Sequence, residues 1–409
     1  MGYEIDGGVL VDAPHPPVPL PTKRSCPFNP PDGYAPLRER ERITRMSYPD
    51  GTSGWLITRH AEAKELLTHK SFSARQEGLV SPVPTELQYE GRPADPGAFA
   101  KTDDPIHGKY RKLLTGFFTV RRTRQLAPMI ERIVHEQLDD LEKAGPGADL
   151  VEVFTESVPS RVMCEMIGVP ESERKTLQRH AETLGRLSCT VPEALAAVSG
   201  MSGFLARFVP ARMDDPRDDI LGDLIRGGQL DEQELMGMAA TLITGAFDTT
   251  GNMLAMGVFT LLEHPEQLAK LQADPELMGG AVEELLRFLT ISHLGAGRWA
   301  LEDVEFAGQT IKKGDVVTVA LPAVNRDPER YANPDQLDIV REDHGHLALG
   351  HGVHQCLGQH LARTILRVGY EALFDRFPTL RLAVPADEVP MRDDFVHYGP
   401  RSLPVTWDD

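Results

Sequence analysis

Long runs with the apolar periodicity of helices fill the middle of this chain, and short β-prone segments stand only near its two ends. This pattern favours a mainly α fold with small β regions. The expected strands span residues 54–58, 304–306 and 316–320. The expected helices span residues 61–67, 105–119, 124–143, 151–168, 171–187, 192–208, 231–263, 265–272, 275–290 and 355–377.

The 409 residues show no internal repeat and no low-complexity linker that would mark a domain boundary. Length alone leaves open two or three ordinary domains or one large domain. The proline-rich residues 11–32 cannot form a helix, because proline lacks an amide donor and restricts the residue before it. We therefore expect an N-terminal arm over residues 1–32.

Acidic residues outnumber basic residues by 61 to 43, which gives a net charge of −18. This balance argues against a general affinity for nucleic acid or anionic membranes. The sequence has no run of eighteen apolar residues and no signal-peptide pattern, so we expect a cytoplasmic protein outside the membrane. The four cysteines lack the paired spacing of a disulfide framework or a zinc site.

Glycines surround the last cysteine, Cys356. Gly350, Gly352 and Gly358 permit tight turns and the close approach of a flat ligand, and the amides that begin the following helix can stabilise a thiolate. A cysteine taken by itself is more often a small buried apolar side chain. The residues alone leave these two roles open.

A polar run at residues 244–250 interrupts an otherwise apolar helix that spans residues 235–262. Burying Asp248 beside Thr249 is costly unless each group is hydrogen-bonded, and threonine hydroxyls can bond back to helix carbonyls. We therefore expect a kink or a local widening here. Its role can be structural or chemical.

The segment 346–363 resembles the haem-binding loop of the cytochrome P450 family, Phe-x-x-Gly-x-x-x-Cys-x-Gly, at Gly352, Cys356 and Gly358. Leu349 stands where the family has phenylalanine, and it is expected to change the redox potential modestly through packing. The resemblance implies that the Cys356 thiolate is the axial ligand of a haem b iron, which in this family favours cleavage of dioxygen. It also implies that His354 bonds a haem propionate.

The run at 244–250 is similar to the oxygen-activation motif of the same family, with Gly245 and with Ala246 in place of a second glycine. By this resemblance, Thr249 hydrogen-bonds bound dioxygen and Asp248 feeds protons through water. The alternative role for both residues is a structural kink network.

Glu284 and Arg287 lie three residues apart on an expected helix and can form an ion pair. In the family, this pair is a structural lock behind the haem, completed by an arginine. Gln336 takes the place of that arginine here, so either Arg341 or Arg330 is the expected third partner.

Haem propionates need basic partners. The resemblance assigns this role to His107 and Arg111, four residues apart on one helix, and to Arg298. An exposed helical face is the alternative for the first two. Further basic residues nearby either steer an acidic ferredoxin or form a solvated face; they are Lys109, Lys112, Arg121, Arg122 and Arg124.

The resemblance covers nearly the whole chain. It implies a single triangular, mainly α domain over residues 1–409 with a buried haem, and a monomer. It also implies a monooxygenase that receives electrons from NAD(P)H through a separate ferredoxin and ferredoxin reductase, and that uses dioxygen to hydroxylate or epoxidise its substrate.

The segments that line the family's substrate pocket are rich in apolar residues here, which favours a lipophilic substrate. Soluble actinobacterial members suggest a polyketide, macrolide, terpenoid or foreign compound. Alternatives are a peroxygenase or haem-thiolate isomerase without an electron donor, and a non-catalytic haem sensor. The expected pocket residues are Leu79, Val80, Leu187, Phe247, Ile291, Leu294 and Val396.

Overall fold

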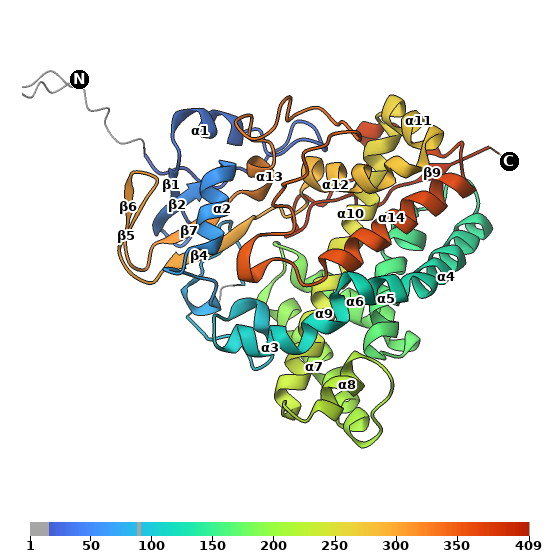
Figure 1. Ribbon diagram of the computed structural model, residues 1–409, viewed down its shortest axis with the longest axis horizontal. Helices are drawn as coiled ribbons and strands as arrows, with labels where there is room; N and C mark the ends of the chain where they lie inside the picture. Colours follow the sequence, from blue (N-terminus) through green and yellow to red (C-terminus); the bar gives the residue numbers. More distant parts are fainter. Residues whose placement is uncertain (1–15, 88–90, 409) are drawn as a thin grey trace, which may run out of the picture.

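The computed structural model describes residues 16–87 and 91–408, and helices dominate it (Figure 1). The first seven helices are α1 (Tyr34–Arg40), α2 (His60–Thr68), α3 (Ile106–Thr115), α4 (Val120–Ala144), α5 (Ser157–Ile167), α6 (Glu171–Gly185) and α7 (Val191–Asp214). The other seven are α8 (Ile220–Gly227), α9 (Glu232–Phe247), α10 (Thr249–Leu262), α11 (Pro265–Ala273), α12 (Met278–Leu289), α13 (Leu321–Val324) and α14 (Gln359–Arg376). The expected mainly α architecture is confirmed.

The strands form one five-stranded sheet and two small hairpin-like pairs. The sheet has the order β1-β2-β7-β4-β3, in which only β2 and β7 pair in parallel, with Leu56 opposite Thr318. Figure 1 shows this sheet at the end of the molecule near the N-terminus, away from α4 and α14. The strands are β1 (Thr44–Ser47), β2 (Ser53–Ile57), β3 (Phe72–Ser73), β4 (Ala296–Ala300), β5 (Val304–Phe306), β6 (Gln309–Ile311), β7 (Val316–Val319), β8 (Arg381–Leu382) and β9 (Val405–Thr406).

Helix α10 lies in the middle of the helical layers, and every residue from Thr250 to Leu261 is buried. It packs against α14, where the Tyr370 hydroxyl donates a hydrogen bond to the Met253 carbonyl at 2.9 Å. Gly257 makes this contact possible, because a Cβ there would lie 1.9 Å from the Tyr370 hydroxyl. An all-round apolar helix of this kind is buried by necessity.

The expected disturbance of the long helix is present as a break at Asp248. Helix α9 ends at Phe247 and α10 begins at Thr249. The Thr249 hydroxyl donates back to the Gly245 carbonyl at 2.8 Å, and the Asn252 amide donates to the Asp248 carbonyl at 2.9 Å. Side chains thus donate hydrogen bonds to backbone carbonyls near the break, as expected for polar residues inside a helix.

Some elements were not expected from the sequence. These include the short helices α1 and α8 and the strand β4. Helix α7 continues to Asp214, beyond the predicted end at residue 208. The described part of the proline-rich arm, residues 16–32, contains no helix, and Val18 forms an isolated bridge with Met46.

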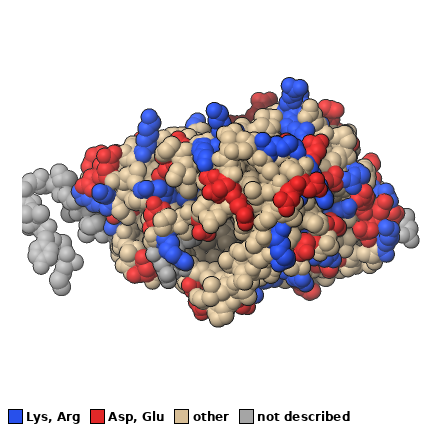
Figure 2. Space-filling view, turned by 90° about the horizontal axis from the view of Figure 1, so that it is seen from below, with Lys and Arg blue, Asp and Glu red and all other residues tan. Residues whose placement is uncertain are grey.

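Helix α7 is also the one described helix that is long and apolar enough to cross a membrane by length and composition, and 33% of its apolar window is buried in the fold. The core helix of a soluble protein meets the same criteria. Seen from below, the molecule carries charged side chains of both signs and is hollowed near its centre (Figure 2).

Candidate functional site

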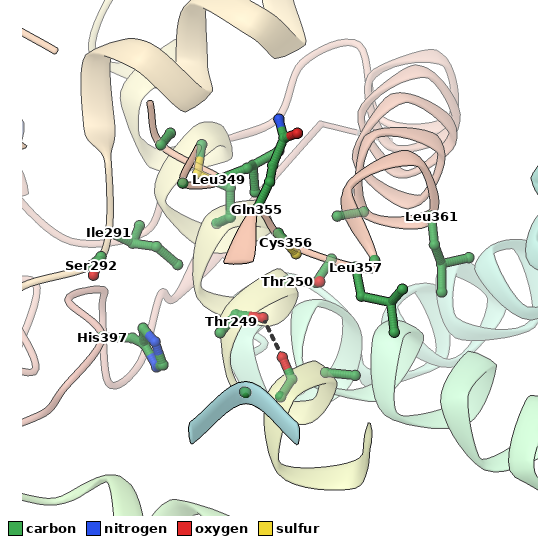
Figure 3. Close-up of a pocket in the computed structure, with 18 of the residues that line it drawn as sticks. Thr249, Thr250, Ile291, Ser292, Leu349, Gln355, Cys356, Leu357, Leu361 and His397 are labelled. Atoms are coloured by element: carbon green, nitrogen blue, oxygen red, sulfur yellow. Dashed lines mark hydrogen bonds between the residues drawn. The ribbon is translucent and has the colours of Figure 1, made fainter. Parts of the chain in front are cut away.

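A cavity of about 450 Å³ lies between the α9–α10 helix pair and the loop that carries Cys356. Its walls come from α3, α5, α9, α10, α12 and α14 and from the segments around residues 290–296 and 348–358. Figure 3 shows Thr249 and Thr250 on the central helix, with Cys356 and Leu349 on the loop above them. The break at Asp248 therefore borders the cavity.

The loop before α14 holds Cys356 at this cavity. Gly350 and Gly352 adopt positive φ angles of 75° and 74°, and a Cβ on Gly352 would lie 2.7 Å from the Leu67 carbonyl oxygen, so glycine is needed there. The Cys356 amide donates to the Leu349 carbonyl at 2.8 Å. Of the four cysteines, Cys356 is the one that lines the cavity.

The groups around Cys356 have opposing effects on the pKa of its thiol. Burial raises the pKa of Cys356 above its usual value, while the Gly358 amide and the positive charges of Arg111 and Arg363 lower it. A thiolate in a buried position needs a positive partner to remain charged. A metal ion bound at the sulfur atom would supply that charge.

Basic side chains gather at one edge of the cavity with few acidic partners. His107, Arg111 and His354 line it, and the rings of His107 and His354 are 4.2 Å apart between centroids. Nε2 of His107 is buried without a hydrogen-bond partner. Burial, His354 and Arg111 together lower the pKa of His107.

Arg298 lies on β4 outside the cavity wall and is buried, with its guanidinium donating to the neighbouring Gly297 carbonyl at 2.7 Å. Burial lowers the pKa of Arg298, and the negative charge of Asp103 opposes that effect. Buried cations without full partners fit an anionic ligand. The thiol, the basic edge and the unpartnered His107 nitrogen therefore fit a haem with its propionates.

Asp248 and Thr249 differ in their position. Thr249 lines the cavity, whereas Asp248 does not. Asp248 borders a second, small cavity between Glu156, helix α6 and the helix break. Burial raises the pKa of Asp248, but hydrogen bonds from His397 and Asn252 and the charge of Arg392 outweigh it, so that the pKa is lowered. Asp248 is thus held as a carboxylate.

Sequence reasoning missed the groups that hold Asp248. Oδ1 receives a hydrogen bond from Asn252 and forms an ion pair with Arg392, each at 2.9 Å, while Oδ2 lies 2.7 Å from Nδ1 of His397. His397 is a cavity-lining residue in the segment near residue 396 that was expected at the pocket. Its partner is 149 residues away in the sequence, and no local pattern joins the two.

The cavity wall also corrects the expected substrate pocket. Of the seven apolar residues proposed for it, Ile291 lines the cavity, and Ala246, Leu349 and Gly358 from the haem motifs do so too. Phe247 lies in the helical core with 1% exposure, because its side of α9 faces the protein interior. The remaining five expected residues do not line this cavity; they are Leu79, Val80, Leu187, Leu294 and Val396. Val80, Leu187 and Leu294 instead pack against the apolar cluster beside the sheet.

Glu284 and Arg287 form a buried two-pronged ion pair away from the cavity, with N–O distances of 2.7 and 2.8 Å. The third partner is Arg341, whose Nε donates to Glu284 at 3.1 Å. Arg330 is instead engaged by Asp343. Gln336 contributes its backbone carbonyl, which accepts from Arg287 at 3.4 Å.

Comparison with known proteins agrees with this fold and cavity. Residues 206–397 match the sequence profile of the family described as Cytochrome P450. Cytochrome P450 105C1 of a Streptomyces species is 44% identical over 96% of this chain and 99% of its own length. Vitamin D3 dihydroxylase of Streptomyces griseolus is 40% identical over 95% of this chain and 96% of its own length.

Solved structures give the same result. The crystal structure of CYP105P1 in complex with filipin I has a TM-score of 0.88 and 40% sequence identity, and the match covers 96% of this chain and 99% of that chain. Fold and site together define a haem-thiolate oxygenase. The chain belongs to the cytochrome P450 family and is an oxidoreductase that incorporates oxygen.

Proposed function

We propose that this chain is a monooxygenase that binds haem b through the Cys356 thiolate and hydroxylates or epoxidises a lipophilic small molecule. The observation that carries the proposal is the position of Cys356, the one cysteine on the cavity, opposite Thr249 on the broken helix. When bound, a thiolate-ligated haem supplies the dioxygen chemistry that inserts one oxygen atom into a substrate and releases the other as water.

The chain's own residues would hold the cofactor and control protons. His107, Arg111 and His354 are suited to bind one or both propionates, because they line the same edge of the cavity. Arg298 would add a buried positive charge behind that edge. The Thr249 hydroxyl, at the helix break, is placed to donate or accept a proton inside the cavity.

The cavity favours a lipophilic substrate, since apolar residues form most of its wall outside the basic edge. Two relatives point to the size of molecule: one is named a vitamin D3 dihydroxylase, and one was crystallised with filipin I. A secondary metabolite or a foreign compound of this kind is our proposed substrate class.

We further propose a cytoplasmic monomer whose electrons come from NAD(P)H through a separate ferredoxin and its reductase. Exposed basic side chains on α3 and at the start of α4 offer a surface that attracts an acidic electron carrier. Arg111, on the same helix as the first two of them, lines the cavity. These exposed residues are Lys109, Lys112, Arg121, Arg122 and Arg124.

A ligand screen on the purified haem protein tests the substrate class. Vitamin D3, filipin I and a biphenyl compound are each expected to change the spin state of the ferric haem in a saturable way, because entry into the cavity displaces water near the iron. Glucose serves as the hydrophilic control and is expected to leave the spectrum unchanged. A haem protein that responds to none of the three lipophilic probes would contradict the proposed substrate class.

Replacing Thr249 by alanine is expected to raise the peroxide formed per NADPH several-fold while haem content stays the same. The reason is that the hydroxyl, not the fold, is lost at a position on the cavity wall. Peroxide and NADPH are measured together under turnover. The matched control is Thr250→Ala, a neighbouring threonine that also lines the cavity. Equal peroxide yields in the two variants would show that the Thr249 hydroxyl has no special role in proton transfer.

A further inference from the structure

Two polar side chains lie next to each other on the otherwise apolar part of the cavity wall. Ser292 and His397 pair in an isolated antiparallel bridge, and both residues line the cavity. Residues that pair directly in an antiparallel arrangement place their side chains on the same face. Figure 3 shows both residues on the left of the view, with Leu357 and Leu361 on the right. Ser292 and His397 thus form a polar pair on one side of the cavity.

The backbone that carries His397 is fixed on both sides of this residue. The His293 amide donates a hydrogen bond to the Val396 carbonyl at 3.1 Å. The Tyr398 amide donates to the Ile291 carbonyl at 2.9 Å. A side chain that is already ordered loses little further conformational entropy when it contacts a ligand. His397 is therefore in position before a substrate enters the cavity.

The Asp248 carboxylate fixes the imidazole ring from outside the cavity. Nδ1 of His397 lies 2.7 Å from Oδ2 of Asp248. Burial raises the pKa of Asp248, but the hydrogen bond from His397 and the charge of Arg392 outweigh burial and lower the pKa, so Asp248 is a carboxylate. Because a carboxylate oxygen accepts hydrogen bonds and has no hydrogen to donate, the hydrogen of this bond belongs to Nδ1.

The other ring nitrogen, Nε2, is left for the cavity. It has no hydrogen-bond partner among the described residues, and it is not buried. Asp248 already has a cationic partner, because Nη2 of Arg392 lies 2.9 Å from its Oδ1. The carboxylate therefore needs no second cation, and a neutral imidazole completes the group. In a neutral imidazole that carries its hydrogen on Nδ1, Nε2 is a hydrogen-bond acceptor.

Neighbouring hydroxyl groups on the cavity wall have also used their hydrogens within the fold. The Ser292 hydroxyl donates to the Gly295 carbonyl at 3.4 Å. The Thr249 hydroxyl donates to the Gly245 carbonyl at 2.8 Å. Both oxygens keep lone pairs, so this side of the cavity offers acceptors and lacks donors. An acceptor that loses water and finds no donor is unfavourable, which suits a ligand that brings a donor.

We propose that Nε2 of His397, supported by Ser292, accepts a hydrogen bond from a hydroxyl group of the substrate. This inference rests on the proposed function and narrows its substrate class to lipophilic molecules that carry such a hydroxyl group. No covalent bond changes in this contact. His397 is a specificity-determining residue, because a site that hydrogen-bonds a substrate hydroxyl discriminates against the analogue without it.

Three biphenyls of similar shape test the proposal on the haem-loaded full chain. The compound para-hydroxybiphenyl can donate a hydrogen bond, para-methoxybiphenyl can only accept one, and para-methylbiphenyl does neither. Equilibrium dialysis gives the dissociation constants, so the assay needs no electron donor and no change at the iron. The measurements are made at about pH 8, above the pKa of about 6.5 of a free imidazole.

His397→Phe keeps a ring at this position but removes both nitrogens. We expect it to weaken the binding of para-hydroxybiphenyl, relative to that of para-methylbiphenyl, by about 3- to 10-fold, because one hydrogen bond is lost. The relative binding of para-methoxybiphenyl should stay the same. The matched control is Ile291→Val, which changes the volume of the same wall without a polar atom and should leave all these ratios unchanged.

Two results of this assay would overturn the proposal. An unchanged ratio in His397→Phe would show that the imidazole does not recognise the hydroxyl group. An equal effect of His397→Phe on para-methoxybiphenyl and para-hydroxybiphenyl would show that Nε2 does not act as an acceptor.

An NMR measurement reads the state of the ring without a substitution that changes the fold. In the diamagnetic ferrous carbon monoxide form with ¹⁵N-labelled histidine, a bare ring nitrogen and a protonated one give well-separated signals. The His397 signals are assigned by their loss in His397→Phe or His397→Gln. We expect a protonated Nδ1 and a bare Nε2 whose signal shifts when para-hydroxybiphenyl is added. A protonated Nε2 in the parent protein would overturn the proposal.

The two proposals fail in different ways. If the parent lacks a thiolate-type carbon monoxide spectrum, the iron ligand of the proposed function is wrong, while the probe affinities still test the polar pair. If none of the three biphenyls binds, the lipophilic substrate class fails, and the protonation of Nε2 still decides this inference. If the probes bind but His397→Phe leaves their ratios unchanged, the polar pair alone fails.

Discussion

Cys356→Ala is expected to lose the absorption band that is specific for thiolate-ligated ferrous haem with carbon monoxide, and with it all oxygenation activity. The reason is that Cys356 is the one cysteine on the cavity, while the basic residues that fit the propionates remain in the variant. The variant should therefore still bind some haem, but with a histidine-type or unligated spectrum. Absorption spectra after reduction under carbon monoxide measure this directly.

Cys164→Ala is the matched control for this experiment. Cys164 lies on α5 in the helical core with 3% exposure, where burial raises its pKa to about 12. It is a neutral apolar side chain there, so its removal should leave the thiolate band intact. A thiolate band that survives in Cys356→Ala, or that disappears in Cys164→Ala, would refute the assignment of the ligand.

The second large effect is expected from Arg287→Met, which should reduce the free energy of unfolding by about 3–5 kcal/mol, because it leaves the buried Glu284 carboxylate without its main partner. Both side chains are only 1% exposed. Arg287 also donates to the Asn325 and Pro334 carbonyls, each at 2.9 Å, so the change breaks contacts between α12 and the segment after α13. Urea unfolding followed by circular dichroism measures the loss.

The control for this variant is Arg132→Met. Arg132 makes two ion pairs, with Glu136 and Glu165, but its side chain is 46% exposed. Exposed pairs contribute about 0–1 kcal/mol, so this change should shift the unfolding midpoint little. A similar loss of unfolding free energy in the two variants would mean that burial does not set the strength of the Glu284–Arg287 pair.

The sequence predicts well those features that arise from a local pattern. The long helices follow from apolar periodicity, and the break at Asp248 follows from polar residues in an apolar helix. Helix α8 was missed although Asp219 caps its start and Ile220, Leu221 and Leu224 form a buried apolar face. Strand β4 was missed because Ala296–Ala300 contains a glycine and an arginine, and its pairing with β7 and β3 sets its conformation.

Features that depend on distant contacts could not be obtained in this way. The choice between Arg341 and Arg330 as partner of Glu284 is made by the fold, which brings Asp343 to Arg330. Phe247 was expected at the pocket because of its place in the motif, but the direction of its side chain depends on how α9 packs. The contact between His397 and Asp248 could not be predicted, because only the tertiary structure brings these two residues together.

The parallel pairing of β2 with β7 has a consequence for the synthesis of this protein. Ile57 pairs with Val319, which is synthesised more than two hundred residues later, so the centre of the sheet cannot form before then. At about 5–20 residues per second, the first strands remain without these partners for roughly ten to fifty seconds on the ribosome. During that interval their unpaired edges are open to aggregation. Chaperones that bind the nascent chain during this interval should therefore raise the yield of soluble protein.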